Sequence, residues 1–592
     1  MYKAPVEEIA FTLKHVAGLA KAIDDGKLGD LSDDLVDAIL SEAGRFASDE
    51  VAPLAEIGDA QGARMVDGKV IVPDGWADLY RHWAEGGWNS LTAAEEFGGQ
   101  ALPHMLNVAA LEMWNSGSMA FALGPTLTMG AVDAVTVHGA DSLKQTYLPK
   151  MVSGEWTGTM NLTEPHAGSD LGVMKSRAER RDDGTYRIFG QKIFITWGEH
   201  EITENIIHLV LARLPDAPAG TRGITLFLVP KYLVNEDGSL GARNDLHCHS
   251  LEHKLGIHGS PTCTMIYGDG KFGDEPGAIG YLIGEENKGL NCMFTMMNNA
   301  RLAVGMQGVA ICEASTQKAV QYAKDRTQGK APGWTGQGMS PIIEHPDVAR
   351  MLVTMKALTQ GARAICYTCA HATDMSHHEE GEAARHWAER AALLTPIAKS
   401  FATDAGVEVA SLGIQTHGGM GFIEETGAAR FWRDSRIAPI YEGTNGIQAA
   451  DLVTRKLSLS NGAQVRGFIQ ELKDTVSAVR TSNLEGFGET ADRLEASLAD
   501  LEETTEWLLA QLAAGNASTA LAGATPYQRL FGLALTGVYL AKGALADEEH
   551  GRDNRLALCR FAAENIIAET AALKDRVING AASLEAARAL FA

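Results

Sequence analysis

The sequence lacks the marks of secreted, membrane and nucleic-acid-binding proteins. Its 592 residues include seven Cys, an odd number without paired spacing, which favours a reduced, cytoplasmic setting. The first residues, MYKAPVEEIAF, do not form a secretory leader, and no continuous apolar run reaches the roughly 18 residues of a membrane span. The formal net charge of -24 repels phosphate backbones and anionic lipid. We therefore expect no nucleic-acid partner and no membrane insertion.

Common catalytic and metal-binding patterns are also missing. The sequence has no GxxxxGK[ST], GxSxG or HExxH, and no GxGxxG that joins a strand to a helix. Cys366 and Cys369 form a single CxxC without a second pair, which is typical of buried thiols. Five residues between 247 and 258 (His247, Cys248, His249, His253 and His258) lack the paired spacing of a zinc site. We therefore expect no metal.

The chain is too long for one hydrophobic core, and its texture changes along its length. Helical periodicity dominates residues 1–155, whereas 156–282 hold short runs rich in Val, Ile, Thr and Phe, separated by Gly and Asp. Helical patterns return in 283–458 and continue in 459–592. The sequence thus predicts an α+β multidomain fold: an N-terminal helical domain, a middle β-barrel or sandwich, a helical bundle and an additional C-terminal helical domain.

Three stretches stand out from this texture. The first is Met160 to Asp170, MNLTEPHAGSD, in which hydroxyl and turn residues stand at the start of the β-rich region. The second, Lys192 to Thr196, is KIFIT, and the third, Ala438 to Gln448, is APIYEGTNGIQ. Taken alone, the first stretch is better explained as a strand-exit turn.

Together these stretches resemble the characteristic segments of acyl-CoA dehydrogenases, in the order that the family has them. Three further segments resemble the remaining family motifs: Arg301–Gly305, Tyr322–Lys330 and Gln415–Gly421. The resemblance covers roughly residues 60–455. It implies an FAD enzyme that oxidises an acyl-CoA thioester at Cα–Cβ, and it implies the multidomain fold predicted from the texture.

The resemblance also implies roles for individual residues. The implied flavin contacts are Leu162 and Thr163 at the pyrimidine edge, Phe194 and Thr196 beside the ring, and Thr444 and Asn445. Ser169 would reach the FAD pyrophosphate or the CoA, and Arg301, Tyr441 and Gly443 would contact the substrate. Arg326, Gln328, Gln415 and Gly419 would bind the FAD of a neighbouring subunit, which makes a homo-oligomer, most simply a homodimer, part of the prediction.

Glu442 resembles the catalytic base of the family. The α-hydrogen of a thioester is weakly acidic, so a base must act while the forming enolate is stabilised. A dry pocket raises the pKa of a carboxylate and makes it a stronger base. Glu442 follows the apolar segment from Ile437 to Tyr441, which fits a surface loop poorly. The expected product is a trans-2-enoyl-CoA.

The sequence departs from the family pattern at several positions. Trp197 stands where Asn is common, and Ala300 removes a hydroxyl before Arg301. His258 replaces a commoner Arg, and the Arg326 motif lacks the usual Phe before Gly329. These departures leave the contacts at the flavin edge and the CoA less determined than the position of the base.

The extra C-terminal region, the length and the N-terminal MYKAPVEEIAFTL resemble the larger subgroup whose members dehydrogenate 3-methylmercaptopropionyl-CoA in bacterial dimethylsulfoniopropionate breakdown. The electron acceptor implied is an electron-transfer flavoprotein. A short or medium straight-chain acyl-CoA dehydrogenase of fatty acid metabolism and an acyl-CoA oxidase remain open alternatives. A non-catalytic DNA-binding homologue fits poorly, because residues 461–592 hold 12 Lys+Arg against 18 Asp+Glu, a net charge of -6.

Overall fold

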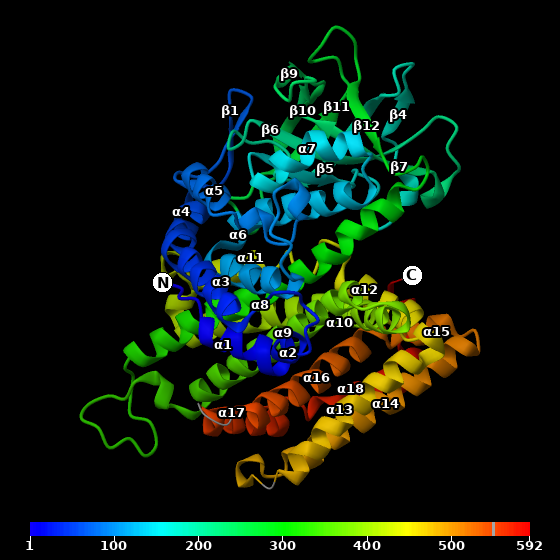
Figure 1. Ribbon diagram of the computed structural model, residues 1–592. Coiled ribbons are helices and arrows are strands. Elements are labelled where there is room, and N and C mark those ends of the chain that lie inside the picture. The colour runs from blue at the N-terminus through cyan, green and yellow to red at the C-terminus, as the bar shows by residue number, and fades with distance from the viewer. Residues whose placement is uncertain (483, 548–550, 592) are drawn as a thin grey trace. The chain divides into compact units, whose positions relative to one another are not determined.

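The computed structural model describes residues 1–482, 484–547 and 551–591, and most of its helices and strands are labelled in Figure 1. Contacts divide the chain into two compact units. Unit 1 comprises Met1–Arg45, His104–Ser116 and Arg301–Ala592, and unit 2 comprises Phe46–Pro103 and Gly117–Ala300. Two long helices, α6 (His104–His138) and α8 (Gly289–Asp325), each contribute residues to both units. The division into four domains at 155, 282 and 458 stays a prediction.

Unit 2 is built around a curled β-sheet. Its strands are β3 (Trp156–Asn161), β4 (Arg177–Arg180), β5 (Tyr186–Thr196), β6 (Asn205–Arg213), β7 (Ile224–Pro230), β10 (Leu246–Leu251), β11 (Thr262–Tyr267) and β12 (Ala278–Ile283). The strand order is β10-β11-β5-β12-β7-β6-β3, and β4 pairs with both β5 and β6. Through β4 the pairings β5-β12-β7-β6 return to β5, so the sheet closes on itself. The sequence predicted a barrel or a sandwich here, and the closed pairing shows a barrel.

Strand β6 explains why this part of the sequence has continuous apolar runs. Ile207, Leu209 and Leu211 point into a cluster that includes residues of α6 and of α7 (Asp141–Ser153). Val210 and Ala212, on the other face, join the barrel interior. A strand buried on both faces shows no alternation of apolar and polar residues. Its full burial therefore follows from its position between helices and barrel core.

Shorter elements complete unit 2. They are α4 (Ala55–Gln61), α5 (Trp76–Glu85), the hairpin of β1 (Arg64–Val66) with β2 (Lys69–Ile71), and the hairpin of β8 (Tyr232–Val234) with β9 (Leu240–Arg243). Residues 268–273, GDGKFG, do have the Gly-x-Gly-x-x-Gly spacing directly after β11. The chain then continues through bends to β12 instead of opening a helix. The segment with this spacing is therefore a loop between two strands and not a dinucleotide-binding turn.

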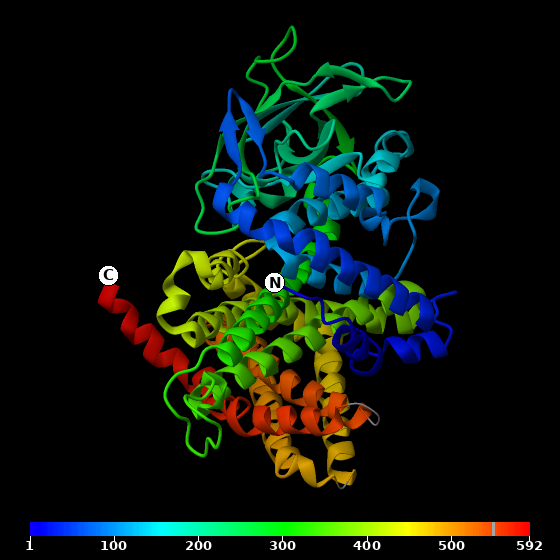
Figure 2. The same ribbon diagram turned by 90° about the vertical axis from the view of Figure 1, so that its left-hand side faces the viewer.

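Unit 1 is helical. Besides parts of α6 and α8 it holds α1 (Val6–Phe11), α2 (Leu19–Asp24), α3 (Asp33–Phe46), α9 (Pro346–His378), α10 (Gly381–His417), α11 (Ala428–Ser435), α12 (Asn445–Asp451), α13 (Ala463–Thr481), α14 (Thr490–Ala513), α15 (Ala517–Ala522), α16 (Ala524–Ala546), α17 (Arg552–Asn565) and α18 (Glu569–Ala587). Helices α9 and α10 form a long antiparallel pair, and α16 packs against α9. Figure 2 shows α18 leading to the C-terminus at the end of the helical region.

The N-terminal segment contacts helices α16 and α17 within unit 1. The ammonium of Lys542 on α16 donates to the carbonyl oxygen of Val16 at 2.7 Å, and Arg555 on α17 pairs with Glu8 at 2.7 Å. The guanidinium of Arg555 also lies over the ring of Phe11. The extra C-terminal region thus holds the N-terminal segment in place.

Among the residues that the structure describes, two helices are long and apolar enough to cross a membrane by length and composition, although the sequence has no continuous apolar run of that length. They are α6 and α16, with mean hydropathy 1.3 and 1.2 over their most apolar windows. In α6 72% and in α16 78% of that window is buried inside the protein. Their apolar character is thus used in packing. The expected cytoplasmic location stays a prediction.

Candidate active site

Glu442 lies in a short loop between α11 and α12 of unit 1. Its backbone is left-handed, with φ +54°, and Gly443 follows with φ +85°. Glycine suits this backbone conformation, and a Cβ at position 443 would stand 2.5 Å from Nε2 at the end of the Gln448 side chain. The hydroxyl of Thr444 accepts from the backbone N–H of Ile447 at 3.3 Å and caps α12. The loop is therefore sharply turned and fixed at its exit.

The surroundings of Glu442 suit a carboxylate with a perturbed pKa. The side chain is partly buried. Burial raises its pKa above the ordinary value, and the positive charges of Arg301 and Lys399 partly oppose this shift. A raised pKa and nearby cations are common at catalytic carboxylates. This environment agrees with the sequence-based prediction of a base at this position.

Two other predicted substrate residues lie close by in unit 1. Burial lowers the pKa of Arg301, and the carboxylates of Asp451 and Glu442 oppose that effect. Among the described residues, Nε of Arg301 is buried and has no hydrogen-bond partner. Tyr441 donates its hydroxyl to Oε1 of Gln307 on α8, and burial raises its pKa. Arg301 and Tyr441 are thus both held in the surroundings of Glu442, which agrees with their prediction as neighbours of the substrate.

Sequence reasoning missed Lys399, which touches the loop directly. Lys399 is fully buried on α10, and its ammonium donates to the carbonyl oxygen of Gly443 and to Oδ1 of Asn445, both at 2.8 Å. Burial lowers the pKa of Lys399 to about 8, while Asp404 and Glu442 counteract the shift. The sequence signal that could have identified Lys399 is a lysine within an apolar segment, because an apolar helix segment rarely carries a charge. The neighbouring apolar residues are Ile397, Ala398, Phe401 and Ala402.

Asn445, predicted to contact the cofactor, is buried and bonds to α10. Its amide nitrogen donates to Oδ1 of Asp404 at 2.7 Å and to the hydroxyl of Thr403 at 3.0 Å. Its oxygen accepts from Lys399. In this structure Asn445 therefore anchors the loop, and a cofactor contact of its side chain stays a prediction.

The predicted flavin contacts of unit 2 follow β3 and lie along the end of β5. The backbone N–H of Ile193 donates to the carbonyl of Thr163 at 2.9 Å, which joins the two segments. Beneath them lies an ion pair of Lys192 and Glu164, 2.9 Å apart and almost fully buried. Lys192 also donates to the carbonyl of Leu162 at 2.9 Å. The buried pair therefore fixes the backbone that carries Leu162 and Thr163.

Phe194 and Thr196 stand at the end of β5. Phe194 is left-handed, with φ +60°, and its ring is 58% exposed, whereas Thr196 is half-buried. The hydroxyl of Thr159 donates to the carbonyl of Thr196 at 2.7 Å. An exposed apolar ring beside half-buried hydroxyl groups offers a flat surface and polar edge contacts. These side chains fit a flavin ring.

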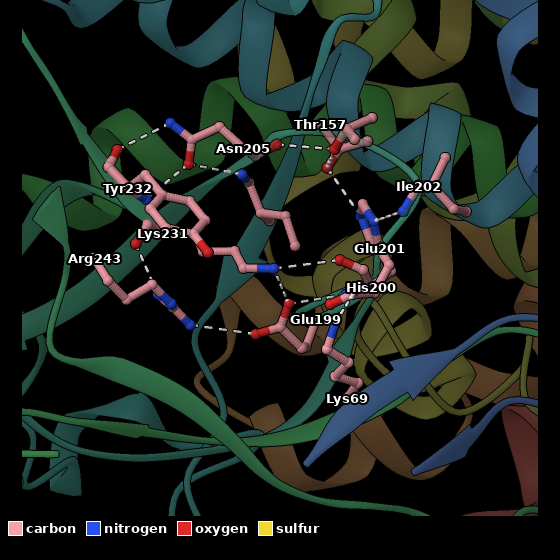
Figure 3. A network of polar contacts seen from close by, with 12 residues as sticks. Lys69, Thr157, Glu199, His200, Glu201, Ile202, Asn205, Lys231, Tyr232 and Arg243 are labelled. Carbon is pink, nitrogen blue, oxygen red and sulfur yellow. Dashed lines mark hydrogen bonds and ion pairs between the residues drawn. The ribbon is translucent and has the colours of Figure 1, made fainter. Parts of the chain in front are cut away.

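The segment after Thr196 is held by a buried polar network (Figure 3). Glu199 accepts from Lys231 at 2.5 Å and from Arg243 at 3.4 Å. His200 lies 3.0 Å from the hydroxyl of Thr157, and burial together with the charge of Lys231 lowers its pKa to about 3. His200 is therefore neutral at ordinary pH. The network fixes the path of the chain beyond β5.

Trp197, the departure at the family's Asn position, is also part of this fixed segment. It is fully buried and donates its indole N–H to the hydroxyl of Ser260 at 3.2 Å. Its ring packs edge-on against Phe121 with centroids 6.2 Å apart. Trp197 thus belongs to the core of unit 2.

The remaining predicted residues are exposed. Ser169 lies in the loop after β3. Arg326 donates to Oε1 of Gln328 at 3.3 Å in the loop after α8, and Gln415 and Gly419 lie at the end of α10. Their predicted contacts with FAD, CoA or a neighbouring subunit stay predictions.

Four family models match the chain in succession. The N-terminal domain of acyl-CoA dehydrogenases matches residues 34–155, the middle domain 159–269 and the C-terminal domain 287–457. A fourth, described as acetyl-CoA dehydrogenase C-terminal like, matches 463–588. The chain belongs to the acyl-CoA dehydrogenase family. It is thus an FAD-dependent oxidoreductase of acyl-CoA thioesters, as the sequence motifs indicated.

Individual relatives agree with this assignment. The chain is 45% identical to 3-methylmercaptopropionyl-CoA dehydrogenase of Ruegeria pomeroyi, over 96% of this chain and 95% of that protein. It is 35% identical to a butyryl-CoA dehydrogenase of Syntrophomonas wolfei, over 81% of this chain and 80% of that protein. Among solved structures, an acyl-CoA dehydrogenase of Bacillus anthracis complexed with FAD has TM-score 0.75 at 20% identity, covering 94% of this chain and 90% of that one. This last likeness confirms the fold.

Proposed function

We propose that this enzyme dehydrogenates 3-methylmercaptopropionyl-CoA, that Glu442 is its base, and that its electrons pass to an electron-transfer flavoprotein. The observation that carries the role of Glu442 is its place in the structure: a partly buried carboxylate with a raised pKa, on a left-handed turn beside two cations. The substrate rests on the 45% identity to the Ruegeria pomeroyi enzyme over nearly the whole of both chains.

In the proposed reaction the Glu442 carboxylate takes the proton from Cα of the acyl chain. The electron pair of that C–H bond would form the Cα–Cβ double bond, and FAD, when bound, would supply the acceptor for the hydride from Cβ. Arg301 holds the CoA portion in this proposal, in keeping with its place beside Glu442. The pKa of Glu442, raised by burial, makes the carboxylate a stronger base toward a weakly acidic C–H group.

The residues of unit 2 would hold the FAD ring. The half-buried hydroxyl groups of Thr163 and Thr196 suit its polar edge, and the exposed ring of Phe194 suits its face. Lys192 and Glu164 keep the supporting backbone in place. We also propose a homodimer, because the residues implied in contacts with a neighbouring subunit's FAD (Arg326, Gln328, Gln415 and Gly419) all lie exposed in unit 1.

A second candidate is a dehydrogenase of straight-chain acyl-CoA, which the 35% identity to a butyryl-CoA dehydrogenase favours. A thioether is nearly isosteric with a methylene group, so both substrates would fit a similar pocket. Valeryl-CoA is the matched control, because it differs from 3-methylmercaptopropionyl-CoA only by a methylene in place of sulfur.

The test is anaerobic flavin bleaching by single turnover with 3-methylmercaptopropionyl-CoA, valeryl-CoA and a series from propionyl- to octanoyl-CoA. We expect the thioether substrate to bleach the flavin fastest, and Glu442→Gln to bind FAD and substrate but bleach about 10²- to 10⁴-fold more slowly. Equal rates for the thioether and valeryl substrates would favour the straight-chain candidate. Bleaching of Glu442→Gln at the wild-type rate would place the base elsewhere.

The electron acceptor is tested separately in air. An electron-transfer flavoprotein should reoxidise the reduced enzyme, while oxygen alone should do so slowly. Hydrogen peroxide formed in proportion to the product would instead identify an acyl-CoA oxidase.

A further inference from the structure

Lys399 is a charged group in a place that ordinarily excludes charge. It is fully buried on α10, between Ala398 and Ser400, which are also buried. An ammonium ion in a protein interior is stable only when its donors are satisfied and an opposite charge is near. The partners of Lys399 therefore indicate why the chain keeps a lysine there.

Two hydrogen bonds of Lys399 lead to the segment that carries Glu442. One goes to the carbonyl oxygen of Gly443, the next residue in the chain, and the other to Oδ1 of Asn445, each at 2.8 Å. Asn445 is bound in turn to α10, since its amide donates to Asp404 and to the carbonyl of Ser400. Lys399 and Asn445 thus connect α10 to the loop through hydrogen bonds.

These hydrogen bonds stabilise a loop whose backbone is strained. Glu442 has φ +54°, a left-handed conformation that a residue with a side chain adopts at a cost and keeps only when its surroundings impose it. The carbonyl of Glu442 accepts from Nε2 of Gln448 at 3.2 Å. The carbonyl groups of Glu442 and Gly443 are therefore both held from outside, directly after the Cα atom that carries the Glu442 side chain.

The charges around Glu442 also point to Lys399. The ionisable groups that act on the Glu442 carboxylate are Arg301 from α8 and Lys399 from α10. Lys399 is itself influenced by Asp404, Glu442 and Arg301. The ammonium of Lys399 is bound to the loop, whereas Nε of Arg301 has no hydrogen-bond partner among the described residues. Lys399 is thus the cation that is tied to the loop of the base.

We propose that Lys399 is a positioning residue for Glu442: it holds the left-handed turn through Gly443 and Asn445, and its ammonium charge favours the ionised, proton-accepting form of Glu442. This inference rests on the proposed role of Glu442 as the base. It assigns to α10 a part in catalysis that acts through the backbone of the loop.

The variant Lys399→Met removes the charge and both hydrogen bonds at similar volume. The holoenzyme is studied by two measurements: the pH profile of single-turnover flavin bleaching, and hydrogen exchange of peptides covering residues 439–448. We expect the acid limb of the profile to move to higher pH, the maximal rate to fall roughly 10- to 100-fold, and exchange in this segment to become faster.

Lys399→Arg, which keeps the charge, should restore the position of the acid limb although not the full rate. The matched control is Lys542→Met, because Lys542 is also a largely buried lysine of unit 1 that donates to a backbone carbonyl, that of Val16. It should leave both the pH profile and the exchange of 439–448 at wild-type values. If Lys399→Met does not fold, Lys399→Gln replaces it, and the same two measurements decide.

The inference and the proposed function fail in different ways. If Glu442→Gln bleaches the flavin at the wild-type rate, the base has been misassigned. If Glu442→Gln is inactive while the folded Lys399→Met holoenzyme keeps the wild-type acid limb and exchange rates, Glu442 is the base and Lys399 does not position it. A drop in thermal stability of Lys399→Met without either change identifies a merely structural lysine.

Discussion

The ammonium of Lys399 lies 2.8 Å from the carbonyl oxygen of Gly443, although the two residues are 44 positions apart in the chain. This contact joins the long helix α10 to the turn that contains Glu442. The predicted base of this acyl-CoA dehydrogenase is thus supported by a rigid element of the same unit. Catalytic groups gain precision when neighbouring residues fix their backbone in this way.

The first prediction concerns the pH dependence of the wild-type enzyme. Glu442 accepts a proton only when it is ionised, and burial raises its pKa above the ordinary value of 4.5. We therefore expect the bleaching rate to fall as pH decreases through a value above 4.5, and to level off above it. Stopped-flow bleaching at saturating substrate measures this limb. A rate independent of pH down to 4.5 would contradict the burial of Glu442.

The second prediction concerns stability. A carboxyl group whose pKa is raised in the folded state binds its proton more tightly there, so ionisation of Glu442 destabilises the fold as pH rises above 4.5. Glu442→Gln removes that ionisation. We expect Glu442→Gln to have a higher apparent Tm than the wild type at pH 8, and a similar one at pH 4.

Thermal unfolding at the two pH values provides the test. Glu236→Gln is the control, because Glu236 lies exposed in a turn of unit 2 and its replacement should change the Tm at neither pH. An identical Tm for Glu442→Gln and wild type at pH 8 would mean that ionised Glu442 is not destabilised in the folded protein.

The third prediction concerns the ion pair beneath the predicted flavin contacts. Lys192 and Glu164 are almost fully buried, so Lys192→Met leaves a carboxylate without its cation and should destabilise the protein by about 3–5 kcal/mol. FAD occupancy should fall with it, because Lys192 also holds the carbonyl of Leu162. Urea unfolding and the flavin absorbance of the purified variant measure the two effects.

A double variant, Lys192→Met with Glu164→Gln, is the control for this pair. It removes both charges and should recover part of the lost stability. Burial alone would raise the pKa of Glu164, but Lys192 and hydrogen bonds from residues 175 and 176 lower it to about 2. The stabilisation by Glu164 is therefore complete above pH 4.5 and disappears as pH falls toward 2. Acid unfolding that is unchanged in Glu164→Gln would argue against this contribution.

The fourth prediction concerns Phe194. Its ring is 58% exposed, so Phe194→Ala should change the stability of the FAD-free protein little. If the ring covers the flavin, the affinity for FAD should fall about 2- to 10-fold. Fluorescence titration of the FAD-free protein measures the affinity. Phe591→Ala, which removes a 92% exposed ring near the C-terminus, should leave it unchanged.

Local sequence determined the fold class and the family. Short motifs such as TEPHAGSD and YEGTNGIQ keep their order along the chain, and the change from helical to strand periodicity near residue 156 corresponds to the start of β3. Glu442 could be chosen because a carboxylate following an apolar segment is recognisable without coordinates. Each of these signals lies within a few residues of the chain.

Tertiary structure decided how the site is held. No local pattern pairs Lys399 with Gly443, or Lys192 with Glu164, because these contacts join segments that only packing brings together. The same is true of Asn445, which a motif suggests for the cofactor but whose amide bonds to α10. A sequence states which side chains are present; the cost of burying a charge, which depends on three-dimensional surroundings, determines which of them must meet.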